Sequence, residues 1–315
     1  MSLTTAELAT IQSASDVVSS LSLLGSACIL CCYARYAALR KNAFTLVACL
    51  SLSDVLNHVA DFVGPPPADL AVMVAPGAPI SPACWAQALG NAVFELSSVL
   101  WTSAIAATLY AQVMLAIRPE RMERAFYAIS AFCWGLPLVL ALLPLTQGLS
   151  VYGASGSWCW IRAAFPGWIF AIFYAPLWLC MFLNVLVHVR IKARLEAMIR
   201  GGAASTDAAT AAKLALVIER LKWYPFVLIV VWAPASISRI VEAALGRPLF
   251  GLVLFHRLFS SSQGLLNAAA YGLSRGVREA LHADAFRLFP QCVAAPAVAM
   301  EDGVVTAVAA DAGGT

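Results

Sequence analysis

Charged residues are scarce in this chain. Only 12% of its 315 residues are Asp, Glu, Lys or Arg, whereas soluble globular proteins carry about 25%. Hydrophobic residues make up 61% of the chain, and the mean hydropathy is +0.81. These values argue against a soluble cytosolic enzyme and indicate a protein that lies largely in lipid.

Other absences narrow the function further. Residues 249–273 contain no lysine, so the last hydrophobic run offers no Schiff base for retinal. The Cys and His residues show no zinc-site spacing, and no nucleophile with a base stands out. We therefore expect no enzyme activity, no cofactor and no metal site.

The apolar residues form long runs rather than short strands. A helix needs about 20 apolar residues to cross the hydrocarbon core, whereas strands of a membrane barrel are about ten residues of alternating polarity. Seven runs of the helical kind are present, at about 14–35, 43–63, 85–115, 125–145, 167–190, 221–245 and 249–273. The sequence predicts an all-α membrane protein, a bundle of seven transmembrane helices.

The basic residues give the orientation. Sixteen of the twenty fall on one side of the predicted spans: Arg35, Arg40, Lys41, Arg118, Arg121, Arg124, Arg190, Lys192, Arg194, Arg200, Lys213, Arg220, Lys222, Arg275, Arg278 and Arg287. By the positive-inside rule this side is cytoplasmic, which places the N-terminus outside and the C-terminus inside. The net charge of +3 is thus a sign of sidedness and does not indicate nucleic acid binding.

The ends of the chain give further expectations. Residues 1–13 lack a basic residue and are expected to be extracellular, with the first span serving as its own signal anchor. After the bundle (14–273), apolar residues at helical spacing predict an amphipathic inner-leaflet helix over 274–289, which Pro290 ends. Residues 290–315 are predicted to be a disordered cytoplasmic tail. Cys292 in that tail is either a palmitoylation site or an ordinary thiol.

Two of the nine cysteines lie at the predicted outer face. Cys84 precedes the third span, and Cys159 lies in the loop after the fourth. Because the outer side is oxidising, a disulfide between them is plausible and would hold this loop across the top of the third span.

Ionisable groups within a bilayer are costly and functional by default. Most of them fall in the outer halves of the predicted spans, which suggests a polar cavity open to the outside. The candidate ligand-binding residues are Asp61, Asn91, Glu95, Arg162, Arg239, Glu242, His256 and Arg257. The two deep arginines favour an anionic ligand group.

A structural alternative remains open for these groups. Arg239 and Glu242 are three residues apart and can pair on one helix face, and Glu95 can pair with Arg257 across the bundle. Deeper down, Asp54 and Asn267 are candidates for a polar network that differs between two states, or for a purely structural one. Trp232 and Pro234 in the sixth span and Tyr271 in the seventh complete this candidate activation network.

Several motifs together resemble the cyclic AMP receptor-like (class E) family of G-protein-coupled receptors. The most specific are Trp158-Cys159-Trp160-Ile161 and the block from Gln263 to Gly272; Ser51-Leu52-Ser53-Asp54 and Trp134-Gly135-Leu136-Pro137 add to them. The resemblance covers residues 15–285. Three features depart from the pattern: no Asp-Arg-Tyr stands at the inner end of the third span, Pro234 after Trp232 is more similar to the rhodopsin-like hinge, and the tail is short and poor in hydroxyl residues.

This resemblance implies a multi-pass plasma-membrane receptor that binds an extracellular small molecule and activates a heterotrimeric G protein. Cyclic AMP, or a similar anionic molecule, is the ligand that the family suggests. The expected G-protein-facing residues are Arg118, Arg190, Arg194, Arg220 and Lys222, although anchoring to lipid headgroups explains several of them equally well. A small-solute or proton-coupled transporter is the alternative, but the two halves show no convincing repeat.

Overall fold

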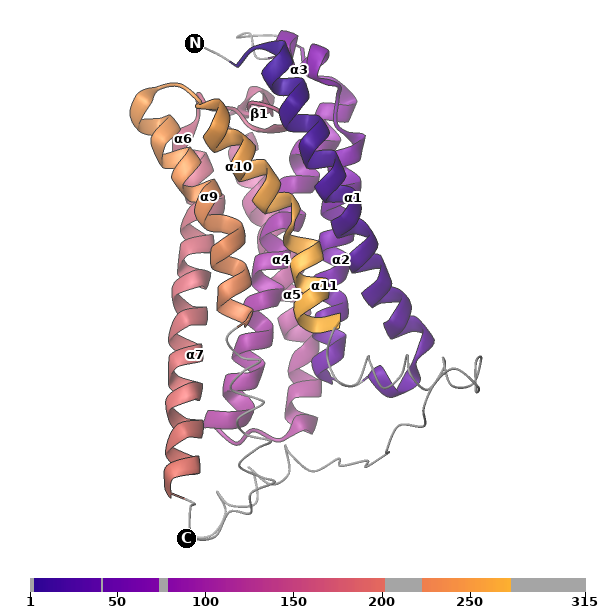
Figure 1. Ribbon diagram of the computed structural model, residues 1–315, viewed down its shortest axis with the longest axis vertical. Coiled ribbons are helices and arrows are strands. Elements are labelled where there is room, and N and C mark those ends of the chain that lie inside the picture. The colour runs from indigo at the N-terminus through magenta and orange to yellow at the C-terminus, as the bar shows by residue number, and fades with distance from the viewer. Residues whose placement is uncertain (1–2, 41, 74–78, 202–222, 273–315) are drawn as a thin grey trace.

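The computed structural model describes residues 3–40, 42–73, 79–201 and 223–272, and its long helices run side by side (Figure 1). The α-helices are α1 (Thr5–Arg35), α2 (Asn42–Val63), α3 (Pro67–Met73), α4 (Pro82–Met114), α5 (Pro119–Leu142), α6 (Pro166–Ile169), α7 (Ala175–Gly201), α9 (Trp223–Leu245), α10 (Phe250–Ser261) and α11 (Gln263–Gly272). Shorter turns are η1 (Ala37–Leu39), η2 (Leu143–Gln147), η3 (Leu149–Val151) and the π-helical η4 (Phe170–Tyr174). Two short strands are β1 (Tyr152–Ala154) and β2 (Cys159–Ile161).

Six helical segments of the described chain are long and apolar enough to cross a membrane. They are Thr5–Arg35, Phe44–Val63, Pro82–Met114, Glu120–Gln147, Pro166–Met198 and Phe226–Leu245. The predicted helical bundle is thereby confirmed as a class of fold. The amphipathic segment 274–289, the tail and Cys292 lie outside the described residues.

The run 249–273 does not form the single long helix that its hydropathy predicts. It contains α10 and α11, which meet at Ser262, and each is shorter than the about 20 residues that a span needs. At this junction the Ser262 amide donates to the carbonyls of Leu258 and Phe259, and its hydroxyl donates to the Phe259 carbonyl at 2.7 Å. Serine side chains that bond nearby carbonyls compete with regular helix geometry, which explains the break.

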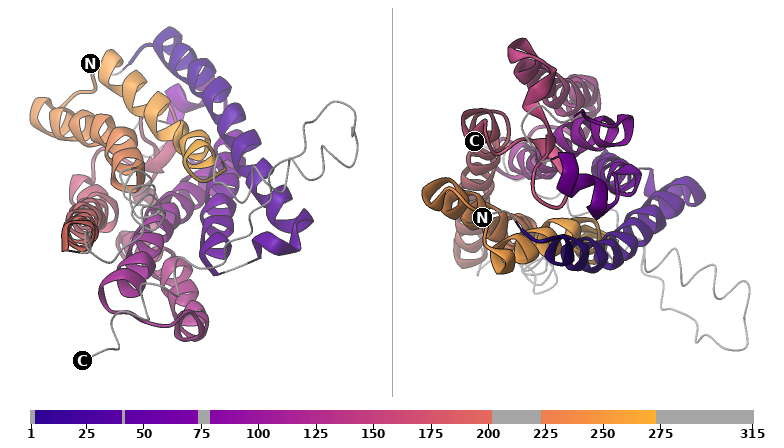
Figure 2. Two further views of the ribbon diagram at one scale, coloured as in Figure 1. Left: turned by 60° about the horizontal axis from the view of Figure 1, so that its bottom comes forward. Right: turned by 90° about the horizontal axis from the view of Figure 1, so that it is seen from above.

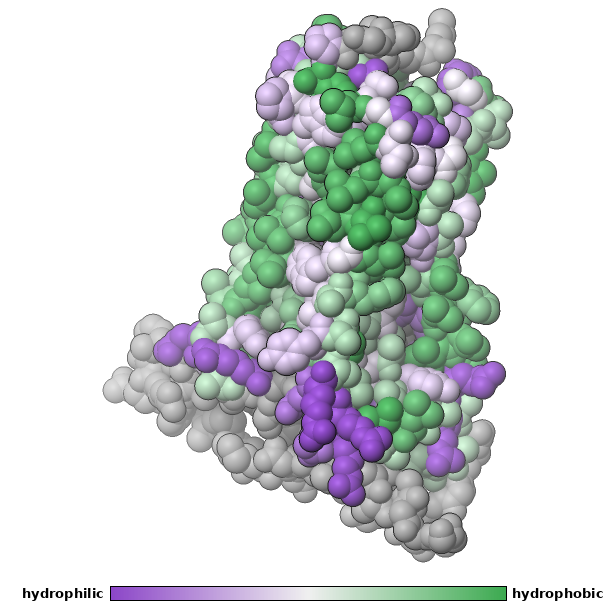
Figure 3. All heavy atoms as spheres, turned by 180° about the vertical axis from the view of Figure 1, so that it is seen from behind, coloured by the Kyte–Doolittle hydropathy of each residue, from purple (hydrophilic) through white to green (hydrophobic). Residues whose placement is uncertain are grey.

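Helix α4 forms the centre of the bundle. It packs against α2, α5, α7 and α9 and against both strands, and Figure 2 shows the other long helices around it. Trp101 and Leu96 on α4 are fully buried. By contrast, large apolar residues on the outer helices remain exposed, such as Phe182 at 65% and Leu24 at 63%. Figure 3 shows a hydrophobic band across the middle, with hydrophilic residues densest at the end away from the strands. This surface suits a lipid environment.

Helix α1 lies close to α10 and α11 because small residues face one another there. Ser15, Ser19, Ser22 and Ser26 form a buried stripe on α1, and the Ser22 hydroxyl donates to the Ser261 carbonyl. A Cβ atom built at Gly264 would lie 2.6 Å from the Ser26 hydroxyl and 3.0 Å from the Ser22 carbonyl oxygen. A larger side chain would therefore crowd Ser26 and the α1 backbone, and small residues are common where membrane helices approach closely.

The two strands form an antiparallel hairpin at one end of the bundle, near α3 (Figure 1). In its register Ala154 is paired with Cys159, and the disulfide between Cys84 and Cys159 ties the hairpin to the start of α4. The predicted disulfide is thus confirmed, with a Cα–Cα distance of 5.2 Å. The buried Tyr152 hydroxyl donates to the Ala141 carbonyl at 2.7 Å, and burial raises its pKa above the ordinary value. The hairpin is consequently part of the core.

Candidate functional site

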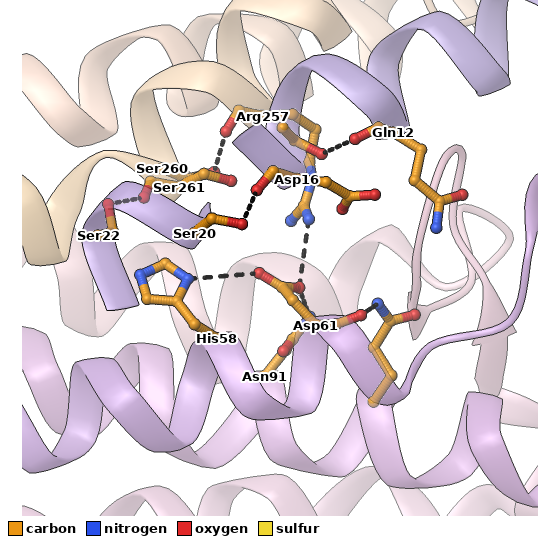
Figure 4. A network of polar contacts seen from close by, with 12 residues as sticks. Gln12, Asp16, Ser20, Ser22, His58, Asp61, Asn91, Arg257, Ser260 and Ser261 are labelled. Carbon is orange, nitrogen blue, oxygen red and sulfur yellow. Dashed lines mark hydrogen bonds and ion pairs between the residues drawn. The ribbon is translucent and has the colours of Figure 1, made fainter. Parts of the chain in front are cut away.

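Asp61 on α2 is the centre of a buried polar cluster near the hairpin (Figure 4). Its carboxylate accepts from Arg257 of α10 at 3.2 Å and from the Asn91 amide of α4 at 3.1 Å. The His58 imidazole lies 3.9 Å from the other carboxylate oxygen. Only 4% of the Asp61 side chain and 6% of the Arg257 side chain are exposed. The desolvated ion pair therefore joins α2 to α10, and the Asn91 hydrogen bond joins α4 to the same carboxylate.

The structural alternative for Arg257 holds with a different partner. The sequence left open a pairing with Glu95, whereas the structure pairs Arg257 with Asp61. Residue depth along a helix fixes a position only along its axis, whereas pairing also depends on the direction in which each side chain leaves the helix. Depth alone makes Glu95 a possible partner of Arg257, but the side chain that reaches Arg257 is that of Asp61 on α2.

Arg239 on α9 forms a second buried ion pair. Its guanidinium donates to Glu242 at 2.6 Å, as the three-residue spacing predicts, and to the Ser155 hydroxyl of the hairpin at 3.2 Å. This arginine is 5% exposed. Both arginines of the candidate site are thus neutralised by carboxylates of the chain itself.

Trp158 of the hairpin lies against both arginines. The guanidinium carbon of Arg257 is 4.8 Å from the centre of a Trp158 ring, and that of Arg239 is 5.0 Å away. The His256 ring packs edge-on against the same indole at 5.1 Å. Cation–π contacts of this kind contribute about 2 kcal/mol when desolvated. Trp158 therefore fills the space where the sequence predicts an anion-binding fork.

The donor capacity of this cluster is not fully used. Among the described residues, the Nε atoms of Arg239 and Arg257 and the Nδ1 atom of His256 are buried without a hydrogen-bond partner. Buried polar atoms without partners are costly and call for an explanation. A ligand that rearranges the cluster would be able to satisfy them.

Glu95 has a different environment from its neighbours. It lines a small cavity of about 10 Å³, which is about the space that one water molecule needs. The other lining residues are Asp54, Asn57, His58, Ser98, Trp232, Ser260 and Gln263. Glu95 thus lies between the outer cluster and the deeper network around Asp54.

Asp54 is the centre of that deeper network. Its carboxylate accepts from Ser98 of α4 at 2.6 Å and from Asn267 of α11 at 2.9 Å, and the Gln263 amide donates to the Ser98 hydroxyl. The expected partnership of Asp54 and Asn267 is therefore present. The network links α2, α4 and α11, and Asp54 itself is 3% exposed.

Trp232 and Pro234 lie on α9 beside this network. Trp232 is 2% exposed, lines the cavity, and packs against Phe173 of η4 with ring centres 4.9 Å apart. Pro234 stands inside α9, where it removes one backbone hydrogen bond and weakens the helix locally. Tyr271 belongs to α11, but its side chain is outside the described set.

The remaining predicted residues do not join the outer cluster. Arg162 follows β2, and its Nε atom donates to the Tyr152 carbonyl at 3.2 Å. Arg118 is the N-cap residue of α5, and Arg190 and Arg194 lie on the half of α7 that is distant in sequence from the hairpin. Arg220 and Lys222 fall outside the described residues.

Sequence reasoning missed three contributors to the site. Gln87 accepts from the Cys159 amide at 2.8 Å and donates to the Asp61 carbonyl at 3.1 Å, so it joins hairpin, α4 and α2. Ser98 completes the Asp54 network. The Trp158 indole packs against the guanidinium groups of both arginines. The sequence signal for Trp158 was its position next to Cys159, because a disulfide at the top of the third span brings the residues beside Cys159 over the bundle.

Comparison with known proteins identifies the family. The chain matches the family described as slime mold cyclic AMP receptor over residues 4–277. It belongs to this family. The relatives include G-protein coupled receptor 1 of Arabidopsis thaliana, 31% identical over 271 residues, which are 84% of this chain and 78% of that protein.

Two Dictyostelium discoideum proteins are also similar. Cyclic AMP receptor-like protein A is 27% identical over 260 residues, and Cyclic AMP receptor 1 is 26% identical over 250 residues. These alignments cover 82% and 77% of this chain but only 63% and 58% of the slime mold proteins. A chain of this family is a receptor of the G-protein-coupled type, a multi-pass protein of the plasma membrane, and not an enzyme.

Proposed function

We propose that this receptor binds an extracellular, anionic small molecule at the outer cluster and activates a heterotrimeric G protein. The observation that carries the proposal is the meeting of Arg239, Arg257 and His256 on one indole, Trp158. Two guanidiniums and an imidazole in one desolvated place form a strong site for a carboxylate or phosphate group. Similarity to the Dictyostelium cyclic AMP receptors supports a cyclic-nucleotide-like ligand.

The proposed topology has seven spans. In it, α10 and α11 together form one span that is broken at Ser262, with the N-terminus and the hairpin outside and the Lys- and Arg-rich connections inside. This orientation is supported by the distribution of basic residues and by the oxidised cysteine pair at the hairpin end.

Ligand binding would act by competition inside the cluster. An anion that reaches Arg239 and Arg257 competes with Glu242 and Asp61 for the same donors and displaces the Trp158 indole. The ion pair that Asp61 forms between α2 and α10 would then weaken. A ligand shifts a conformational equilibrium only through its different affinity for the two states, and these broken and formed contacts supply that difference.

The signal would pass inward through the residues beneath the cluster. Glu95 and Trp232 line the same small cavity as Asp54, so a change in the outer contacts alters the surroundings of the deeper network. Pro234 gives α9 a point of weakness at this depth. We propose that α9 moves relative to α11 and opens the inner end, where Arg190 and Arg194 of α7 face the G protein.

Nucleotide exchange on purified G protein, with the receptor in nanodiscs, tests this proposal. Cyclic nucleotides and other small phosphates and carboxylates are added one at a time. A ligand is expected to accelerate exchange, and Arg239→Lys is expected to weaken the response, because lysine keeps the charge but loses the planar fork. The matched control is Arg247→Lys, which alters an exposed arginine outside the cluster.

The transporter alternative makes an opposite prediction. Proteoliposomes that show ligand-dependent solute or proton flux, together with no exchange on any G protein of the source organism, would establish transport and overturn the receptor mechanism. Surface expression of the variants must match that of the native protein. A loss of expression in Arg239→Lys would instead assign Arg239 a structural role.

A further inference from the structure

An open cavity of about 710 Å³ lies beside the connection between α4 and α5 and the first turns of α5, at the opposite end of the bundle from the hairpin. Its volume is in the range of small-molecule sites. It is lined by Leu115, Ala116, Ile117, Arg118, Glu120, Arg121 and Arg124. No residue of the outer cluster or of the Asp54 network takes part in it.

Three arginines give this cavity its charge. Arg118, Arg121 and Arg124 follow one another at three-residue spacing, so they lie along neighbouring turns at the start of α5. Within the described part of the chain, none of the three forms an ion pair. Glu120 is the one acidic lining residue. The cavity therefore carries a net positive charge that the described chain does not neutralise.

The backbone adds to this electrostatic preference. The start of α5 is at Pro119, and its N-cap residue Arg118 makes no side-chain capping bond. The first amide groups of a helix lack carbonyl partners and favour anions nearby. The connection before it is held in place by the Ile117 amide, which donates to the Ala111 carbonyl at 3.1 Å. Cavity, arginines and helix start thus all favour an anion.

The cavity lies at the level where lipid headgroups are expected. On the apolar side of the arginines, Tyr127 of α5 is 80% exposed and Phe132 is 55% exposed. Tyrosine is enriched at the boundary between hydrocarbon and water. Leu115, on the rim of the cavity itself, is 59% exposed. A lipid could place its chains along these apolar residues and its headgroup among the guanidiniums.

We propose that this cavity binds the phosphorylated headgroup of an inner-leaflet lipid, of the polyphosphorylated inositol class. The guanidinium groups of the three arginines donate hydrogen bonds to the phosphate oxygens, and basic pockets at the cytoplasmic ends of membrane helices suit such headgroups. The proposal uses the orientation given under the proposed function, in which this end is cytoplasmic. It does not depend on the identity of the extracellular ligand or on G-protein coupling.

The test measures lipid retention on the purified full chain, without ligand or G protein. Native mass spectrometry counts bound lipids after incubation with phosphatidylinositol bisphosphate, with phosphatidylserine, or with soluble inositol trisphosphate. We expect preferential retention of the bisphosphate lipid, and a loss of about tenfold or more in Arg121→Gln/Arg124→Gln. The matched control is Arg190→Gln/Arg194→Gln on α7, which removes the same charge outside the cavity and should change retention less than twofold.

A second pair of variants is expected to change lipid retention in the opposite direction, because it removes negative charge. Glu120→Gln removes a negative charge from the cavity and should increase lipid retention. Glu196→Gln removes a negative charge from α7 beside Lys192 and should not change lipid retention. If a cavity variant and its α7 control change lipid retention equally, the attraction is unspecific and the proposal is overturned. Binding of inositol trisphosphate but not of the lipid would identify a soluble ligand instead. Unchanged lipid retention in Arg121→Gln/Arg124→Gln would show that these arginines do not hold the headgroup, which also overturns it.

Discussion

Asp61 and Arg257 are 196 residues apart in the sequence, and their side chains meet at 3.2 Å inside the bundle. A buried ion pair of this kind adds little net stability, because both charges lose their hydration. Its effect is on specificity, since it fixes α10 against α2 in one rotational position. The hairpin then completes the cluster by placing Trp158 over the arginine.

Asp61→Asn is expected to lower the free energy of unfolding by about 3–5 kcal/mol, because it leaves Arg257 charged and buried without a carboxylate. Thermal unfolding of the purified protein in detergent micelles measures this effect. The double variant Asp61→Asn/Arg257→Gln should be more stable than the sum of the two single effects predicts. If the destabilisation of the double variant equals the sum of the two single effects, the pairing of Asp61 with Arg257 is contradicted.

Ser98→Ala is expected to lower the free energy of unfolding by about 1–3 kcal/mol, because Asp54 and Gln263 both lose a buried partner. Ser98→Thr keeps the hydroxyl and should recover most of this loss. The comparison of the two variants in the same thermal assay separates the hydrogen bond from packing. Equal destabilisation by alanine and threonine would count against the network.

Removing the disulfide with Cys159→Ser is expected to destabilise the protein by about 2–5 kcal/mol and to release the hairpin. Cys84→Ser should have the same effect, and the double variant should add nothing further. Unfolding curves with and without reductant provide the measurement. Cys31→Ser, which alters an exposed free cysteine, is the control and should leave the curve unchanged.

Gly264→Ala tests the close contact between α1 and α11. Its Cβ atom would meet Ser26 and Ser22, so we expect a destabilisation of about 1–3 kcal/mol from overpacking. Gly251→Ala is the matched control in α10, because a Cβ atom there meets nothing within 4 Å. The control should be neutral or should stabilise the helix by up to about 1 kcal/mol. Similar melting temperatures for both variants would disprove the close approach.

The long helices were predictable because their apolar runs match the thickness of a bilayer. The same hydropathy could not show the break at Ser262, since that depends on which carbonyl one serine hydroxyl selects. The disulfide was predictable because both cysteines lie at one membrane face. The pairing of Arg257 was not, because helix rotation decides between Asp61 and Glu95, and the sequence of one chain carries no direct measure of rotation.

The close packing of Gly264 has a mechanical consequence. It fixes α11 against α1 on one side of Ser262, while the Asp61–Arg257 pair and the Trp158 contact fix α10 on the other side. Helix α1 also holds the inner end of α10, because the Ser22 hydroxyl donates to the Ser261 carbonyl next to the junction. A displacement of the outer half of α10 would therefore reach α11 through the torsion angles around Ser262, the one residue between the two helices.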